Sequence, residues 1–317
     1  MPLTEKQIAG IVSRALPGHV MKSCEPVTGG VINMLYRLRL DGLNDALVLR
    51  VFTRDRDACR KEVDLHQLVS GRVPVPEILY ANPDGEADVG PYVLMRWVEG
   101  LTYRQLKSRH DERTIAEAAW SMGATLACLQ SFTFPRPGPI LPGLAIGAPF
   151  VDGPDPIPMM IEGWLDSAVL ARRLDASERE GIREFIWNRA AELAGFNGDR
   201  CLVHSDFGSP NVILKQSRGK WAVAALLDWE FAFSGCSLCD VGHALRYERW
   251  SRPQMEPHFS TGFRENGGVL PENWREISRA MDLTALVEML TRPALPEGVA
   301  SEIVELIEAT VENRERF

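Results

Sequence analysis

Residues 201–214 decide the fold, and they read C-L-V-H-S-D-F-G-S-P-N-V-I-L. A short apolar strand is expected to lead into a polar loop, and a second apolar strand is expected to leave it. The loop carries Asp206 and, five residues later, Asn211. A further apolar run, 222–227, ends at Asp228. We therefore expect these three oxygen-bearing side chains at adjacent strand ends.

Such a set of side chains suits phosphoryl transfer. A carboxylate can orient an attacking hydroxyl and accept its proton, while other oxygen ligands hold a divalent cation against the phosphates. Protein kinases use a catalytic-loop Asp and Asn at this spacing and a metal-binding Asp on a later strand. Alone, an Asp and an Asn in a loop are also ordinary turn residues. The kinase interpretation therefore rests on the full set in its expected structural context.

The sequence on either side of this stretch divides the chain into two parts. Up to residue 98 strands dominate, with a helix that begins after the Thr4 capping box and another over 54–69. The strand patterns lie within 22–52 and at 78–80 and 92–97, and a turn is expected at 82–85. Helical spacing dominates beyond, at 115–129, from a capping box at Ser177 to Gly195, at 272–291 and at 299–314. We expect a sheet-rich N-lobe over 1–98, a helical C-lobe over 99–317, and a ligand cleft between them.

A family resemblance follows from the polar loop and the later strand end. The run H-S-D at 204–206, with Asn211 behind it and L-D-W-E at 227–230, resembles the H-G-D-x-x-x-x-N and I-D-W-E signature of the aminoglycoside phosphotransferase and choline kinase group. Ser205 stands where that family usually has Gly. The resemblance implies an α+β, protein-kinase-like fold with a small antiparallel-sheet N-lobe and a larger, mainly helical C-lobe.

The same resemblance assigns roles in the C-lobe. It implies that Asp206 is the catalytic base and that Asn211 and Asp228 bind Mg²⁺. It gives His204 the role of supporting the loop. The run G-C-S-L-C-D that ends at Asp240 resembles the family's G-x-P-L-x-D-L segment, in which this Asp braces the catalytic loop.

In the N-lobe the resemblance implies a nucleotide site for ATP or GTP. A turn with two glycines would cover the nucleotide, an Arg would contact the phosphates and pair with a Glu on the next helix, and the hinge backbone would meet the purine. These residues are Gly29, Gly30, Arg50, Glu62, Arg96 and Val98. The glycines also fit a plain hairpin, and the ion pair an ordinary surface bridge. On the family interpretation, Arg50→Ala weakens nucleotide use and leaves the fold intact.

The acceptor would be a small hydroxylated molecule. Its candidate ligands are Glu162 and Asp166, which share a face if that stretch is helical, together with Glu230. A solvated helix face is the alternative. The net charge of −8 and the family favour a cationic acceptor, such as an aminoglycoside-like molecule, in a pocket shaped by the Pro- and Gly-rich loop 132–158.

Composition excludes other partners. We find no Lys/Arg cluster for a nucleic acid and no apolar run long enough for a membrane span, and the N-terminus does not resemble a signal peptide. We therefore expect a cytoplasmic protein, and its oligomeric state stays open.

Two further alternatives concern a cysteine pair and the activity itself. Cys236 and Cys239, with His243 nearby, fit half a zinc or redox site or two small residues in a turn.

A catalytically inactive protein that binds nucleotide or a partner is the alternative function. A protein kinase is disfavoured, because D-W-E replaces D-F-G and no A-P-E follows.

Overall fold

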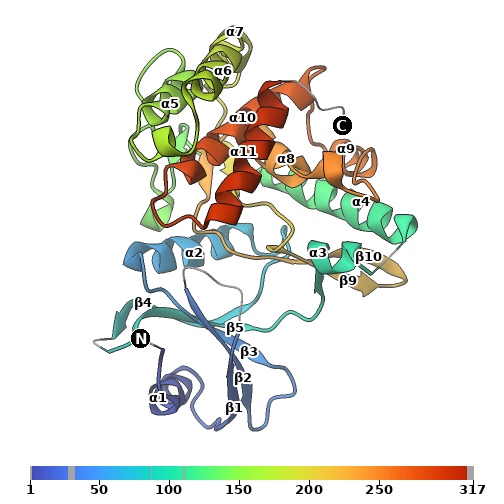
Figure 1. Ribbon diagram of the computed structural model, residues 1–317. Coiled ribbons are helices and arrows are strands. Elements are labelled where there is room, and N and C mark those ends of the chain that lie inside the picture. Colours follow the sequence, from blue (N-terminus) through green and yellow to red (C-terminus); the bar gives the residue numbers. More distant parts are fainter. Residues whose placement is uncertain (1, 28–32, 87, 110, 313–317) are drawn as a thin grey trace.

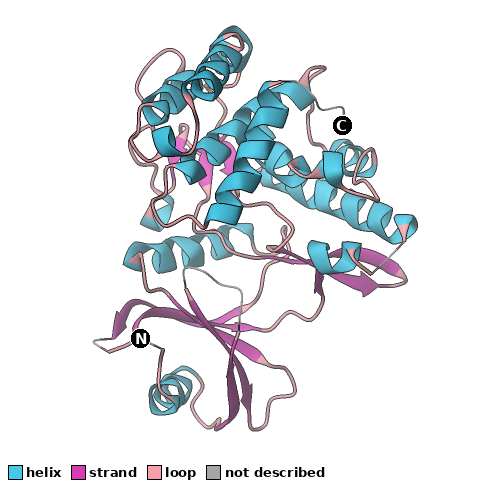
Figure 2. Ribbon diagram, viewed as in Figure 1, coloured by secondary structure: helices cyan, strands magenta, loops and turns pink. Residues whose placement is uncertain are grey.

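The protein has a strand-rich N-terminal part and a helix-rich C-terminal part (Figures 1 and 2). The structure is a computed structural model that describes residues 2–27, 33–86, 88–109 and 111–312. Gly29 and Gly30 lie outside these residues. The arrangement confirms the expected α+β plan, with a small antiparallel sheet followed by a larger helical part.

Five antiparallel strands form the N-lobe sheet, in the order β1-β2-β3-β5-β4. They are β1 (Met21–Pro26), β2 (Met34–Leu40), β3 (Leu47–Val51), β4 (Ile78–Glu86) and β5 (Gly90–Arg96). β4 runs through residues 82–85, where the sequence predicted a turn. The strand absorbs these turn residues through a register shift between Asn82 and Glu86, and Asn82 Oδ1 accepts a bond from Gly85 N–H inside it (3.1 Å).

Side-chain alternation along β3 explains how the sheet is covered. Leu47, Leu49 and Val51 pack on the face covered by α1 (Glu5–Ala15), which begins at the expected Thr4 capping box. The intervening Val48 and Arg50 point to the other face. That face is covered by α2 (Arg56–Val69), which lies between the sheet and the C-lobe in Figure 1. Period-two alternation thus directs the only charged side chain of β3 toward α2 and the C-lobe.

Helices make up most of the C-lobe. They are α3 (Tyr103–Lys107), α4 (Glu112–Leu129), α5 (Pro156–Leu165), α6 (Ala176–Trp187), α7 (Ala190–Ala194), α8 (Leu238–Leu245), α9 (His258–Glu265), α10 (Trp274–Leu290) and α11 (Glu297–Val311). The capping box expected at Ser177 lies two residues earlier, where Asp175 caps α6 and Glu178 completes the box. α6 also ends before Gly195, at Trp187, and α7 follows as a separate helix. No helix in the described ranges has the length and apolar content to cross a bilayer.

Two three-stranded sheets hold the polar loop of the C-lobe. One has the order β10-β9-β6 and the other β7-β11-β8. Their strands are β6 (Leu101–Thr102), β7 (Gly138–Pro139), β8 (Cys201–Val203), β9 (Val212–Ser217), β10 (Lys220–Leu226) and β11 (Phe233–Gly235). The loop of Asp206 connects β8 to β9, and Asp228 follows the end of β10. Both segments are therefore fixed at strand ends, as the sequence predicted.

The crossing of α8 and α10 requires a glycine. A Cβ on Gly242 of α8 would lie 2.1 Å from the backbone oxygen of Ser278 in α10. We expect Gly242→Ala to lower the free energy of unfolding by about 3 kcal/mol, because two helix backbones would have to separate. Urea denaturation followed by circular dichroism measures this loss.

Gly163 in α5 is the matched control, because a Cβ there meets nothing within 4 Å. Gly163→Ala should instead stabilise the protein by about 0.5–1 kcal/mol, through the lower conformational entropy of the unfolded chain. Equal effects of the two substitutions would contradict the proposed close approach.

Candidate active site

Asp206 lies in the loop between β8 and β9 and accepts hydrogen bonds on both carboxylate oxygens. His243 Nε2 lies 3.3 Å from Oδ1, and Asn211 Nδ2 donates to Oδ2 at 2.7 Å. Burial raises the pKa of the carboxyl, but His243, His204 and Asn211 outweigh that effect and leave the pKa below its ordinary value. Asp206 is therefore ionised at neutral pH, and its side chain stays about one-third exposed. A held, ionised and accessible carboxylate can accept a proton from a bound hydroxyl.

His204 is fully buried beneath this loop. Its Nδ1 accepts a bond from the Asp206 N–H (3.2 Å), and its Nε2 lies 3.0 Å from the carbonyl oxygen of Leu227. A carbonyl only accepts, so Nε2 carries the ring proton. Burial lowers the pKa of His204 to about 4. His204 is thus a neutral ring that connects the loop to the end of β10.

Asp240, at the start of α8, binds the backbone of the same loop. Its carboxylate accepts from His204 N–H at 2.7 Å and from Ser205 N–H at 2.8 Å. Burial raises the pKa of Asp240 to about 7, although these two bonds oppose the rise. Ser205 has φ +68°, which explains why the family usually has Gly at this position. A side chain in this left-handed conformation costs about 1 kcal/mol, which the bond to Asp240 helps to offset.

The loop also meets the strand end that carries Asp228. Leu227 N–H donates to the backbone oxygen of Asn211 at 2.9 Å, which ties the two segments together. The Asn211 amide nitrogen faces Asp206, so its amide oxygen remains for another partner. Asp228 Oδ1 accepts a hydrogen bond from Arg50 Nη2 at 2.7 Å, and the Asp228 side chain is about one-third exposed. Amide and carboxylate oxygens are the ligands that Mg²⁺ prefers, so the residues present fit this cation.

Arg50 connects the two lobes from the centre of the N-lobe sheet. Its guanidinium lies 3.4 Å from Glu62, 2.7 Å from Asp228 and 3.7 Å from Glu230. The Arg50 and Glu62 side chains are only 7% and 1% exposed, which excludes a surface ion pair. Burial, helped by the two other carboxylates, raises the pKa of Glu62 to about 7, although Arg50 opposes the rise. One buried guanidinium is therefore shared by three carboxylates.

The remaining residues predicted to contact the nucleotide lie at the inter-lobe connection. Arg96 ends β5, and its N–H donates to the backbone oxygen of Glu77 at 2.9 Å. The side chain pairs with Glu77 as well, at 2.5 Å. Val98 follows two residues later and is partly buried. Neither Arg96 nor Val98 lines the large cavity described below.

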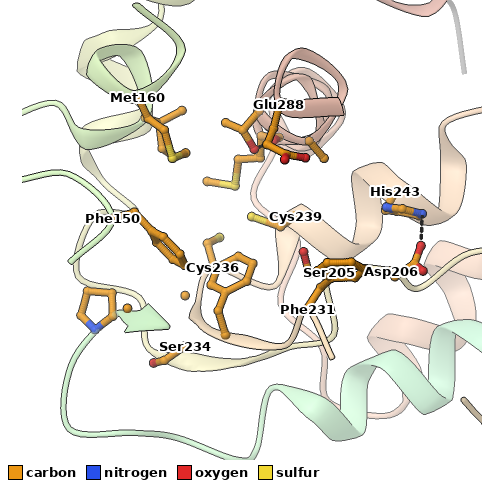
Figure 3. A pocket seen from close by; sticks show the side chains of 18 of the residues that line it. Phe150, Met160, Ser205, Asp206, Phe231, Ser234, Cys236, Cys239, His243 and Glu288 are labelled. Carbon is orange, nitrogen blue, oxygen red and sulfur yellow. Dashed lines mark hydrogen bonds and ion pairs between the residues drawn. The ribbon is translucent and has the colours of Figure 1, made fainter. Parts of the chain in front are cut away.

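A cavity of about 940 Å³ opens beside Asp206. Asn211, Asp228, Glu230 and Arg50 also line it, so catalytic, metal and nucleotide candidates meet in one space. Figure 3 shows Phe150, Met160, Phe231 and two cysteines around this hollow, with Asp206 and His243 at one side. The segment 132–158 contributes part of the wall, as its Pro- and Gly-rich sequence predicted.

Of the three predicted acceptor ligands, only Glu230 reaches this cavity. It accepts a bond from Asn33 Nδ2 at 3.2 Å, on the side of Arg50. Glu162 pairs with Arg183 at 2.9 Å, and Asp166 lies 4.0 Å from the same guanidinium. α5 instead lines the cavity with residues 157, 160 and 164, which share a helix face. Glu162, two positions from 160 and 164, therefore lies on the opposite face.

Cys236 and Cys239 are free cysteines in the cavity wall. Burial raises the pKa of both thiols, which disfavours the reactive thiolate. Among the described residues, no three His, Cys, Asp or Glu side chains gather as a metal site. The geometry favours the interpretation of two small residues without a metal or redox role, although only Cys236 precedes α8 and Cys239 lies in its first turn instead of in a loop turn.

His243 is a residue whose role the sequence did not reveal. It is one helical turn beyond Asp240 on α8, so the two side chains share a face and meet the same loop. Arg246 Nη2 lies 3.2 Å from His243 Nδ1, and Asp282 holds Arg246 with bonds of 2.6 and 2.8 Å. A guanidinium only donates, so Nδ1 accepts and Nε2 carries the proton that faces Asp206. In the sequence, only the three-residue spacing from Asp240 could have indicated that His243 faces the catalytic loop.

Comparisons with known proteins agree with this geometry. A model of the phosphotransferase enzyme family matches residues 23–277, more than half of the chain. Acyl-CoA dehydrogenase family member 11 of Gallus gallus is 25% identical over 183 residues, which are 58% of this chain. The match spans only 22% of that relative's length.

Several solved structures share the fold. Aminoglycoside phosphotransferase APH(4)-Ia superposes with a TM-score of 0.71 over 99% of this chain and 100% of its own, at 20% identity. The ADP-bound APH(2'')-Ib gives 0.65 over 98% and 99%, at 15% identity. A GDP and kanamycin complex of a further APH(2'') enzyme gives 0.68 over 98% and 100%, at 18% identity. From the family match and this shared fold we conclude that the chain belongs to the phosphotransferase enzyme family.

Proposed function

We propose that the protein transfers the γ-phosphate of ATP or GTP to a hydroxyl of a small molecule, in a Mg²⁺-dependent reaction. The observation that carries the proposal is the ionised, doubly hydrogen-bonded Asp206 in one cavity with Asn211, Asp228 and Arg50. Residues 1–98 form the nucleotide-binding lobe in this proposal. Residues 99–317 hold the catalytic loop, the metal ligands and the acceptor.

On the nucleotide side, Arg50 exchanges its contact with Asp228 for one with the phosphates. Its ion pair with Glu62 is kept and holds the side chain at the cleft. Asn211 and Asp228 would hold Mg²⁺, which would neutralise phosphate charge when bound. The backbone at Arg96 and Val98 meets the base in this proposal, and covering the phosphates stays the predicted role of Gly29 and Gly30, which lie outside the described residues. The Arg96 N–H is already bonded to Glu77, so its carbonyl is the group left for a purine.

On the acceptor side, Asp206 orients the hydroxyl and takes its proton. The hydroxyl oxygen forms a bond to the γ-phosphorus, and the bond from that phosphorus to the β,γ-bridging oxygen breaks. The nucleoside diphosphate then leaves. His204 and Asp240 fix the loop backbone, so the carboxylate is positioned before the acceptor arrives. Positioning of this kind provides much of the rate in phosphoryl transfer.

The test is a phosphotransfer assay with ATP and with GTP, titrated with Mg²⁺, over a panel of hydroxylated small molecules. We expect formation of a phosphorylated product that needs both Mg²⁺ and Asp206. Tight Mg²⁺–nucleotide binding without hydrolysis or transfer to any acceptor would instead favour a catalytically inactive binding protein.

His243 should act through Asp206 as a positioning residue. We expect His243→Phe to lower kcat about tenfold and to leave nucleotide affinity unchanged, because Asp206 loses one hydrogen bond to a charged group. His243→Gln should retain most of kcat, since its amide N–H can replace the Nε2–H donor. Steady-state kinetics with a parallel nucleotide titration separates the two effects. Equal losses in the Phe and Gln variants would show that the hydrogen bond has no role.

A further inference from the structure

Beyond Asp206 the cavity wall is largely apolar and aromatic. Its side chains come from the segment before α5, from α5 itself, from β11 with the residues on either side of it, and from α10. They include Phe150, Met160, Trp164, Phe231, Phe233 and Met281. Figure 3 shows Phe150, Met160 and Phe231 around the same hollow as Cys236 and Cys239. Four separate parts of the chain thus contribute apolar groups to one surface.

Two phenylalanines of this wall are exposed. Phe150 is 57% exposed and Phe231 is 41% exposed, although both are large apolar side chains. Phe150 packs edge to face against Phe233, with ring centroids 5.6 Å apart. Aromatic surface that is left open beside a reactive group is typical of a ligand-binding wall. Phe150 and Phe231 are therefore the best candidates for direct contact with an acceptor.

The charged groups of the lining are mostly engaged within the protein. Of the six carboxylates, four receive a bond or ion pair from a neighbouring Arg, His or Asn side chain: Asp206, Asp228, Glu230 and Glu288. Glu288 pairs with Arg292, one turn further along (2.7 Å). Asp152 and Asp199 complete the lining carboxylates of the described residues. Asp199 also has a hydrogen bond with the Cys236 thiol, which leaves Asp152 to hold one ammonium group, whereas a polycation would have to displace the existing partners.

We infer that the cavity binds a hydroxylated molecule with a large, mainly apolar body and at most one positive charge. This inference rests on the proposed phosphotransfer, and it replaces the aminoglycoside-like acceptor expected from net charge and the family resemblance. The hydroxyl faces Asp206, and the apolar body lies between Phe150, Phe231 and α10. A cavity of about 940 Å³ accommodates a drug-sized body in addition to the phosphate end of the nucleotide. Met160 and Met281 are flexible, so the wall can adapt to more than one apolar shape.

The test compares neutral alcohols of increasing apolar size with a polycation. The probes are 2-phenylethanol, 2-(naphthalen-2-yl)ethanol, a pyrene-substituted alkanol and kanamycin, each titrated by calorimetry against the protein saturated with Mg²⁺ and a non-hydrolysable nucleotide. Phosphotransfer to each probe is assayed separately, with ATP and with GTP. We expect affinity to rise along the alcohol series and kanamycin to bind more weakly than the larger alcohols.

Variants locate the binding surface. Phe150→Ala and Phe231→Ala should each weaken the largest alcohol about tenfold, because an apolar contact is lost. Both side chains are exposed, so these changes should leave the fold intact. Trp250→Ala is the matched control, since Trp250 is 50% exposed and lies outside the lining. It should leave the affinity unchanged.

The outcomes separate the inference from the proposed function. Tighter binding and phosphorylation of kanamycin would overturn the apolar acceptor while supporting phosphotransfer. Absence of binding by every alcohol, or equal affinity in the Phe and Trp variants, would also overturn it. Alcohol binding that depends on Phe150 and Phe231, without transfer from either nucleotide, would support the apolar site and count against the proposed reaction.

Discussion

Replacing Asp206 by asparagine should reduce kcat by about a hundredfold or more, the usual loss for a positioned general base. Asparagine keeps the size and can still accept one hydrogen bond, but it cannot take the proton of the acceptor. The nucleotide contacts proposed for Arg50, Asn211 and Asp228 remain, so nucleotide affinity should change little. Steady-state turnover, measured beside a direct nucleotide titration, checks both expectations.

Asp84→Asn is the control for the loss of a carboxylate. Asp84 is 86% exposed in β4 and pairs with Arg60, so its removal should leave kcat unchanged. Near-normal turnover in Asp206→Asn would remove Asp206 from the mechanism. Loss of nucleotide binding together with turnover would instead indicate a structural or metal-holding role for this carboxylate.

Arg50→Ala should lower the free energy of unfolding by about 3 kcal/mol, in addition to weakening nucleotide use. From the sequence we expected the fold to stay intact. The structure changes that expectation, because the substitution leaves Glu62 buried without its cation, and breaking a buried pair on one side costs about 3–5 kcal/mol. Glu62 can bind a proton in the variant, which removes the unpaired buried charge. The loss of unfolding free energy should therefore lie near the lower end of this range. Urea denaturation gives the stability, and the nucleotide KM gives the functional effect.

A double variant separates these two effects. Arg50→Met combined with Glu62→Leu removes both buried charges, so most of the lost stability should return. Nucleotide use should remain impaired, because the group proposed to bind the phosphates is still missing. Full recovery of nucleotide use in the double variant would exclude Arg50 from phosphate binding. An unchanged unfolding free energy in Arg50→Ala would contradict the buried pair.

Part of the candidate site could be predicted from the sequence because its geometry is local. His204, Asp206 and Asn211 lie in one loop between two strands, so their separation is fixed within a few peptide bonds. The side-chain alternation of β3 likewise directs Arg50 to the face of α2. In contrast, His243 meets Asp206 from a helix 37 residues away in sequence (243 − 206), and no local pattern reports that contact.

The acceptor-binding residues show even more clearly that sequence alone does not reveal contacts between distant segments. Net charge and the family resemblance favoured a cationic ligand, with Glu162, Asp166 and Glu230 as its candidate partners. In the fold Glu230 lines the cavity, but Arg183 engages Glu162 and Asp166, and the opposite face of α5 lines the cavity. Whether a carboxylate is free to bind a ligand depends on which cations lie beside it. That property belongs to the packed structure and not to composition.

By itself the sequence determined the α+β class, the two-part division of secondary structure and the polar loop that carries Asp206. These features follow from periodicity, strand ends and short-range spacing, which are physical consequences of neighbouring residues. Only the tertiary structure decided that the Arg50–Glu62 pair is buried, that His243 holds Asp206, and that the cavity wall is apolar. Each of these depends on solvent exclusion between segments distant in the chain, and solvent exclusion sets the strength of a charge pair and the chemistry of a pocket.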